Sequence, residues 1–96
     1  MRVKFLKVDK IADAGRNIEK RFINLTQIKM IREIPLNTIL YYREDDKEGE
    51  EKIKLKGFNL SENGYQSVVS LEGEWVYYSK IPVQELLEKC NIEVVL

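Results

Sequence analysis

The sequence predicts a mainly β fold with one C-terminal α-helix, in which an antiparallel meander forms a curved sheet or small barrel capped by the helix. Three observations predict this class. Runs of β-branched and aromatic residues recur along the chain, short turns containing Gly and Asn separate several of them, and only one stretch has helical spacing of its apolar residues. Residues 1–96 are about one domain's length, so we expect a single small globular domain.

The first half of the chain contains three segments with the composition of strands: 2–8, 20–25 and 28–34. Residues 9–19 are expected to form a connection that contains a short helical turn around Gly15. The 28–34 segment also has isoleucines at every third position, which is compatible with a helix. Its isoleucine density and the proline that follows favour a strand, because a residue before proline avoids the α region.

The second half contains four further strand segments: 38–43, 52–58, 65–71 and 74–79. The dipeptide Asn63-Gly64 is the strongest hairpin signal, because a type I′ turn needs positive φ at both central positions. Glu72-Gly73 predicts a second turn. Four consecutive strands joined by short turns predict an antiparallel meander.

One helix is predicted after the last of these strands. Pro82 suits a first helical position, where its missing N–H is no loss. The apolar residues then recur at the spacing of one helical face: Val83, Leu86, Leu87 and Cys90. Asn91 can end the helix, and residues 92–96 are expected to form an apolar strand or tail.

Composition removes several classes of function. The chain has no histidine, which excludes Ser-His and Cys-His nucleophilic pairs and histidine-ligated metals. Its one cysteine cannot form an intramolecular disulfide, its longest apolar runs are four residues, and its N-terminus has no signal-peptide pattern. We therefore expect a soluble cytoplasmic protein with no membrane contact.

The remaining candidates for chemistry are few. Ser79 and Lys80 are neighbours in a strand and so point to opposite faces, and Cys90 shares the apolar helical face, which favours a structural role. The acidic segment Glu44–Glu51 either binds a cation through its carboxylates or forms a solvated hairpin tip; its spacing is not that of an EF-hand. The sequence predicts no enzyme and no cofactor.

Charge is uneven although it sums to zero. Residues 1–33 hold nine basic against four acidic side chains, a net of +5, and residues 34–96 hold seven against twelve, a net of −5. A basic row beside aromatics is typical of small barrels that bind single-stranded nucleic acid. The candidate contacts for such a site are Lys52, Lys54, Lys56, Trp75 and Tyr77. The alternative is that the aromatics fill the core and the lysines keep an edge strand soluble.

Partner binding is the other class of function. Residues 2–8 and 92–96 are both terminal strands that can lie at a sheet edge, where an exposed strand pairs with another chain. The alternative, equally open, is that the two terminal strands pair with each other and close the sheet.

A short stretch resembles a known family. Phe22, Asn24, Ile28, Ile31 and Pro35, followed by Thr38-Ile39-Leu40, are similar to the opening of the small flagellar FlbD-like proteins, which read roughly F-x-x-N, two spaced isoleucines and T-x-I. The match covers about 20 residues; here Asn24 follows Phe22 by only two positions, and this chain has an added N-terminal segment and a longer meander. The resemblance implies a non-enzymatic role in motility and identifies no functional residue.

Together these observations favour a non-catalytic cytoplasmic β-domain that binds protein or self-associates through edge strands. The alternative is a small-barrel protein that binds single-stranded nucleic acid.

Overall fold

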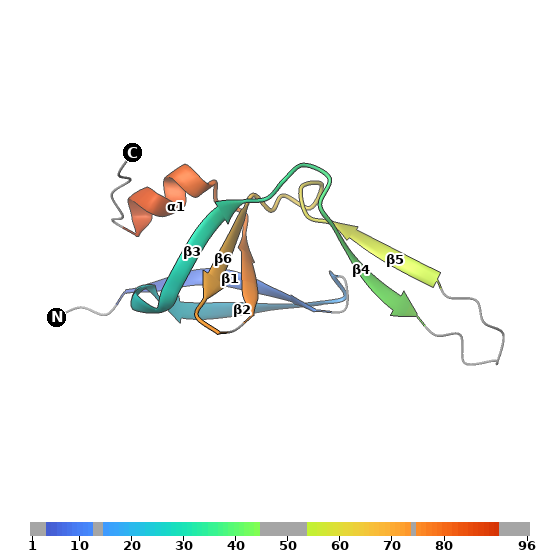
Figure 1. Cartoon of the computed structure of the whole chain (residues 1–96), viewed down its shortest axis with the longest axis horizontal. Helices are drawn as coiled ribbons and strands as arrows, with labels where there is room; N and C mark the ends of the chain where they lie inside the picture. The colour runs from blue at the N-terminus through green and yellow to red at the C-terminus, as the bar shows by residue number, and fades with distance from the viewer. Residues whose placement is uncertain (1–3, 13–14, 45–53, 74, 91–96) are drawn as a thin grey trace.

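The computed structural model describes residues 4–12, 15–44, 54–73 and 75–90. Within these ranges, the side chains of residues 42–44 and 54–56 are not described. The elements, in chain order, are β1 (Phe5–Ala12), β2 (Asn17–Asn24), the 3₁₀ turn η2 (Leu25–Gln27), β3 (Ile28–Glu33), β4 (Ile39–Glu44), β5 (Lys54–Asn59), β6 (Ser67–Leu71), β7 (Val76–Ser79) and α1 (Val83–Lys89). The expected class, mainly antiparallel β with one C-terminal helix, is confirmed (Figure 1).

The described strands form a curved five-stranded sheet and a separate two-stranded ribbon. The sheet has the order β2-β1-β7-β6-β3 and does not close into a barrel, and the ribbon is β4-β5. Figure 1 shows the ribbon projecting from one end of the sheet, with α1 beside β3 at the other end. This arrangement is elongated: the radius of gyration is 16.1 Å, against about 13 Å for a compact chain of this length.

The β1–β2 hairpin is longer than the sequence predicts. All eight residues of β1 pair with β2, from Phe5 opposite Asn24 to Ala12 opposite Asn17. The predicted connection over 9–19 is therefore wrong at its two ends, because residues 9–12 and 17–19 lie in paired strands, whereas the predicted short helical turn at Gly15 is present. Gly15, in the true turn, has φ +91° and lies against the ring of Phe58, so a side chain there would meet that ring.

A bulge in β3 explains the spacing of its isoleucines. Ile28 lies opposite Leu71 and Met30 opposite Ser70, so one extra residue is inserted between these two pairs. A bulge shifts the alternation of faces by one residue. Ile28 and Ile31 therefore pack against the same core although they are three residues apart. The segment is a strand, as predicted.

The predicted pairing of the second and third strands of the meander is wrong. β5 pairs with β4, and β6 pairs with β3 and β7, so Asn63-Gly64 does not join two paired strands. The Asn59 side chain instead accepts the Glu62 N–H, and the Tyr65 N–H donates to Leu60, which makes a compact turn ending at Gly64 with φ +86°. The other expected hairpin, at Glu72-Gly73, is present between β6 and β7.

The predicted helix is present, and it begins at Val83, one residue later than expected. Pro82 is its N-cap rather than its first helical residue, and its carbonyl accepts the Leu86 N–H. Leu86 is fully buried and Cys90 packs partly against the same core. Asn91 and residues 92–96 lie outside the described residues.

Two hydrophobic clusters lie on opposite faces of β6 and β7. Val69 and Tyr77 face the cluster beneath α1, which also contains Leu6, Val8, Ile23 and Leu86. Val68 and Tyr78 face the second cluster, which contains Ile34, Leu60 and Tyr65 with Phe58 at its margin. Neighbouring residues in a strand point to opposite faces, so the same two strands serve both clusters.

Candidate binding surface

The residues considered for catalysis have structural roles. The buried Ser79 hydroxyl accepts the Ile81 N–H at 3.1 Å, and the Lys80 ammonium lies 5.3 Å from the centre of the Tyr65 ring. Burial raises the pKa of the Cys90 thiol, which opposes formation of a thiolate. Within the described ranges, no group of three or more acidic or Cys side chains is arranged to hold a metal ion.

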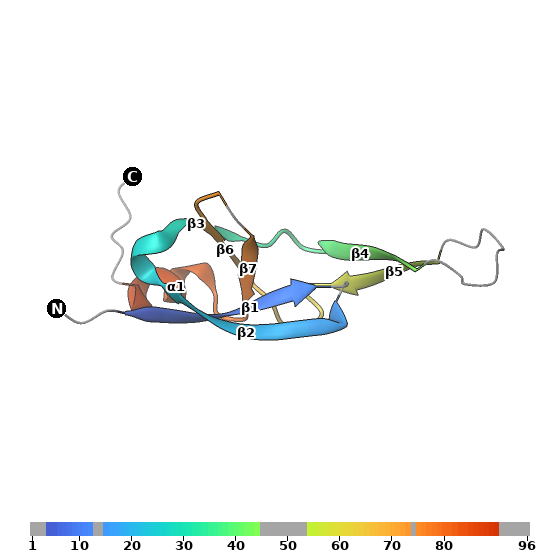
Figure 2. The same ribbon diagram turned by 90° about the horizontal axis from the view of Figure 1, so that it is seen from below.

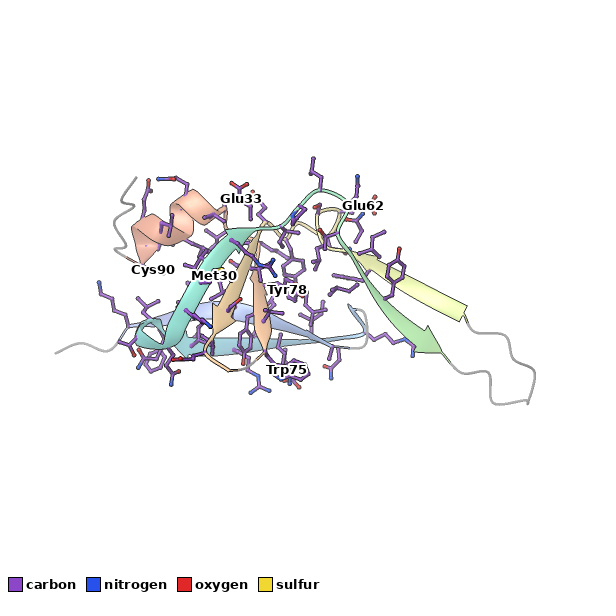
Figure 3. All side chains as sticks on the ribbon, in the orientation of Figure 1. Met30, Glu33, Glu62, Trp75, Tyr78 and Cys90 are labelled. Carbon is purple, nitrogen blue, oxygen red and sulfur yellow. The ribbon has the colours of Figure 1, made fainter. Side chains whose placement is uncertain are left out.

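The predicted nucleic-acid contacts are spread over separate parts of the molecule. Lys54 and Lys56 belong to β5 in the ribbon, and Lys52 lies outside the described residues. Trp75 is 59% exposed at the foot of β7 (Figure 3), whereas Tyr77 is only 9% exposed because it packs in the core beneath α1. The structure thus places Trp75 directly before β7 and Tyr77 within it, and leaves the two described lysines on another sheet.

The sheet edges also differ from expectation. One of the two open alternatives places residues 2–8 at a sheet edge; in the sheet order β1 lies between β2 and β7, and its registered pair with β7 is Asp9 opposite Tyr78. The edge strands of the five-stranded sheet are β2 and β3. The second predicted edge, residues 92–96, and all of the acidic segment except Glu44, lie outside the described residues.

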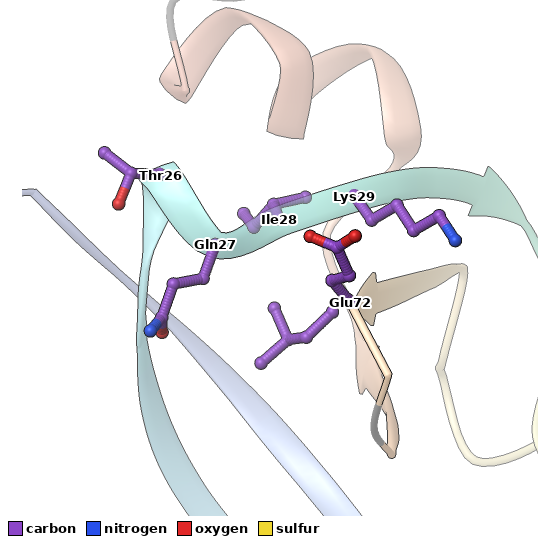
Figure 4. Close-up of a pocket in the computed structure, with 6 residues that line it drawn as sticks. Thr26, Gln27, Ile28, Lys29 and Glu72 are labelled. Atoms are coloured by element: carbon purple, nitrogen blue, oxygen red, sulfur yellow. The ribbon is translucent and has the colours of Figure 1, made fainter.

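Two hollows lie on the surface of the described chain. One, of about 540 Å³, is lined by Thr26, Gln27, Ile28, Lys29, Leu71 and Glu72 (Figure 4). Its polar side chains diverge: Figure 4 shows Gln27 and Lys29 pointing in different directions, and Thr26 is already bonded to Asn24. The other, of about 480 Å³, lies beside Tyr65 and Pro82. A small-molecule site needs polar groups that converge on a ligand, so the first hollow is a poor candidate.

The two most exposed large apolar side chains of the five-stranded sheet, Phe22 and Phe5, lie on the β1–β2 hairpin, together with the exposed Ile18. Phe22 is 68%, Phe5 60% and Ile18 43% exposed. Lys7 lies directly opposite Phe22, and Phe5 lies opposite Asn24. Residues directly opposite each other share a face, so Phe5, Lys7, Ile18 and Phe22 lie on one face of the hairpin and Leu6, Val8 and Ile23 on the other. We call the first set the open hairpin face.

The outer edge of β2 is long and regular. Among the described strands only β1 pairs with it, and that pairing runs through all eight residues without a bulge. Figure 2 shows β2 along the border of the molecule. The other edge strand, β3, has a bulge and has α1 packed beside it, two devices that protect an edge.

Charges of both signs lie in the middle of β2. The Arg21 guanidinium donates to the Glu19 carboxylate at 2.6 Å, and both side chains are about half exposed. The hydrogen bond and the positive charge of Arg21 lower the pKa of Glu19 below its usual range. Lys20, between them, points to the open hairpin face opposite Asp9.

A third exposed aromatic, Trp75, lies near the hairpin. The Lys10 ammonium is 4.7 Å from the centre of the Trp75 ring, which makes a cation–π contact just before the first residue of β7. Trp75 was a predicted site residue, but Phe5, Phe22 and Ile18 were not. Their signal was in the sequence: Phe22 and Ile23 are neighbours in a strand, so one of the two had to face away from the core.

Comparison with models of protein families, with curated proteins and with solved structures finds no match for this chain. In the part of the chain that the structure describes, no helix is long and apolar enough to cross a membrane.

Proposed function

We propose that this protein is a non-catalytic domain that binds protein chains through its β1–β2 hairpin. The single observation that carries this proposal is the open hairpin face, on which two phenylalanines and an isoleucine are exposed together. Fully burying one such side chain stabilises a complex by roughly 1.5–3 kcal/mol. Exposed apolar side chains gathered on one surface are typical of interaction sites.

The charge of the molecule favours a protein partner over a polyanion. Basic and acidic side chains are equal in number, and β2 carries Glu19 directly before Lys20 and Arg21. A mixed-charge strand beside apolar residues suits a polypeptide, which supplies both hydrogen-bonding groups and side chains of either sign. The lone cysteine favours a reducing compartment, so the cytoplasm is part of this proposal. The FlbD-like resemblance implies the same non-enzymatic class.

The test is to select peptides from a random displayed library on the wild-type protein and on the double variant Phe5→Ser/Phe22→Ser. We expect peptides that bind the wild type and lose about tenfold or more in affinity when the two rings are removed. Tyr41→Ser is the matched control, because Tyr41 is equally exposed but lies on the ribbon. The proposal fails if no peptide distinguishes the wild type from the double variant and the wild type does not self-associate.

A second candidate is binding of single-stranded nucleic acid, favoured by the Lys10–Trp75 contact and by the lysines beside Phe22. Bases stack on exposed aromatics, and lysines neutralise phosphates. Titration of short single-stranded DNA and RNA, followed by Trp75 fluorescence at low and physiological salt, tests it. Saturable binding that weakens with salt supports it. Affinity unchanged in Lys52→Ala/Lys54→Ala/Lys56→Ala would remove those lysines from the site.

A further inference from the structure

We propose that the outer edge of β2 binds β2 of a second copy of this chain, antiparallel and centred on Lys20, so that two five-stranded sheets become one. This inference rests on the proposed function and deepens it by naming the partner and the register. It is carried by the self-complementarity of the strand Asn17–Asn24, whose charges and apolar side chains match their own reversed order.

The geometry of an edge-to-edge dimer limits the choice of register. Two antiparallel copies of one strand are related by a two-fold axis perpendicular to the sheet, so the same face of each sheet lies on the same side. Residues that meet must then share a face, and each register is centred on one residue opposite itself. The central candidates on β2 are Glu19, Lys20 and Arg21.

Only the register centred on Lys20 matches charges and apolar groups together. It places Ile18 opposite Phe22 of the second copy, and Glu19 opposite Arg21 of the second copy; the two-fold axis repeats both pairs. Ile18 and Phe22 are the exposed apolar residues of β2, and they lie on the same face. Glu19 and Arg21 lie on the other face, where they already attract each other within one chain.

The neighbouring registers are poorer. A dimer centred on Glu19 brings the two Glu19 carboxylates together and sets Ile18 against Lys20. A dimer centred on Arg21 brings the two guanidiniums together and sets Lys20 against Phe22. Like charges directly opposite each other destabilise a strand pair. The Lys20 register has one such contact, between two long and exposed ammonium side chains that can bend apart into water.

The outer edge of β2 is suited to pairing with another strand. β2 is regular over eight residues, whereas β3 has the bulge and the neighbouring helix. The charge pattern also selects the partner: a nucleic acid would meet Glu19 as well as Arg21, whereas a second copy matches both. A strand pair of this length is a small interface, so association is expected to depend on concentration.

The first experiment is cross-linking of Lys20→Cys in a Cys90→Ala background. Directly opposite Cα atoms in an antiparallel pair are about 4.5–5.5 Å apart, within the range of a disulfide. We expect mild oxidation to convert most of this variant to a covalent dimer. Lys7→Cys, on the inner strand β1, and Lys29→Cys, on the other edge strand, are the matched controls and are expected to remain largely monomeric.

The second experiment is charge exchange, measured by sedimentation from micromolar to near-millimolar concentration. Glu19→Arg and Arg21→Glu each place like charges opposite each other twice, and each is expected to weaken the dimer by about tenfold or more. The double exchange Glu19→Arg/Arg21→Glu restores opposite charges and is expected to restore association. These side chains are exposed, and a thermal unfolding curve for each variant confirms that it folds.

The outcomes separate this inference from the proposed function. Preferential cross-linking of Lys20→Cys and rescue by the double exchange support edge pairing. A wild type that stays monomeric, or that associates without responding to either experiment, overturns edge pairing. So does a monomer that binds single-stranded nucleic acid through the same strand. Peptide binding that depends on Phe5 and Phe22 would still uphold the proposed function in these cases.

Discussion

Three polar side chains in or beside the interior each have a defined partner. The Tyr65 hydroxyl donates to the Asp9 carboxylate at 2.7 Å, and the buried Ser67 hydroxyl donates to the Ile81 carbonyl at 2.6 Å. Ser79 accepts the Ile81 N–H from the other side. A buried polar group without a partner destabilises a fold, so these hydrogen bonds make it possible for polar side chains to lie beside the two hydrophobic clusters. The bonds of Ser67 and Ser79 to the Ile81 backbone also position the segment before α1.

The first prediction concerns Tyr65 at alkaline pH. Burial, and then the hydrogen bond to Asp9 and its charge, raise the pKa of the phenol well above its ordinary value of 10.0. The folded chain therefore favours the neutral phenol, and this contribution to stability is present in full below about pH 10. It is lost as the pH rises toward the folded pKa, because the unfolded tyrosine releases its proton first.

Urea unfolding at a series of pH values measures this effect. We expect Tyr65→Phe to be less stable than wild type by about 1–2 kcal/mol near neutral pH, from the lost hydrogen bond, and to lose less stability above about pH 10. Tyr41→Phe, at an exposed position, is the control. Parallel pH curves for wild type and Tyr65→Phe would contradict the assignment to Tyr65.

The second prediction concerns Gly15. Gly15→Ala meets both a positive φ and the ring of Phe58, whereas Gly73→Ala meets a positive φ of +71° with open space around it. The backbone penalty alone is about 1 kcal/mol, and overpacking adds roughly 1–3 kcal/mol. We expect Gly15→Ala to lower the free energy of unfolding by more than Gly73→Ala, measured by urea titration. Equal losses would show that the Phe58 ring moves aside freely.

At the scale of elements, the sequence predicted what local chemistry determines. The strand after Thr38, the Glu72-Gly73 turn and the helix after Pro82 all follow from side-chain type, turn residues and apolar spacing. Strand pairing does not follow in this way. Asn63-Gly64 has the composition of a hairpin turn, but Leu60 and Tyr65 are both buried in one cluster, and this packing holds the segment as a compact turn.

The open hairpin face likewise depends partly on local sequence and partly on contacts between distant segments. That Phe22 and Ile23 face opposite sides can be read from their adjacency, but which of them is buried depends on what covers each face. Ile23 is buried because α1, from the far end of the chain, packs over that side. The order of strands that leaves β2 at the edge likewise depends on contacts between distant segments, as in the pairing of Asp9 with Tyr78.

The third prediction belongs to the helix. Leu86 is the side chain of α1 that is fully buried in the cluster with Val8, Val69 and Tyr77, whereas Leu87 is only partly covered. Leu86→Ala is expected to lower the free energy of unfolding by about 2–5 kcal/mol. Leu87→Ala, with the same change in volume, is expected to lower it by less. Chemical denaturation of both variants decides; a larger loss for Leu87→Ala would mean that α1 packs through a different face.

At the scale of the whole molecule, two hydrophobic clusters depend on one pair of strands. β6 and β7 supply Val69 and Tyr77 to the cluster beneath α1, and Val68 and Tyr78 to the cluster at the base of the ribbon. The ribbon is held to the sheet through Phe58, which lies against Gly15 and has its ring centre 6.3 Å from that of Tyr65. An isolated two-stranded ribbon is marginal in water, so it depends on this base.

Both clusters contain residues of β6 and β7, so unfolding these two strands would disrupt both clusters at once. We therefore expect the five-stranded sheet and α1 to unfold in one cooperative transition. Leu86→Ala and Leu60→Ala lie in different clusters, and each is expected to shift the whole transition by about 2–5 kcal/mol rather than split it. Trp75 fluorescence and far-ultraviolet circular dichroism should give coincident curves for both variants. Amide hydrogen exchange should be slowest in β6 and β7 and faster in the ribbon, whose contacts with the sheet are confined to its base. Two separate transitions, with Leu60→Ala moving one and Leu86→Ala the other, would show that the clusters are independent and that the shared strands do not couple them.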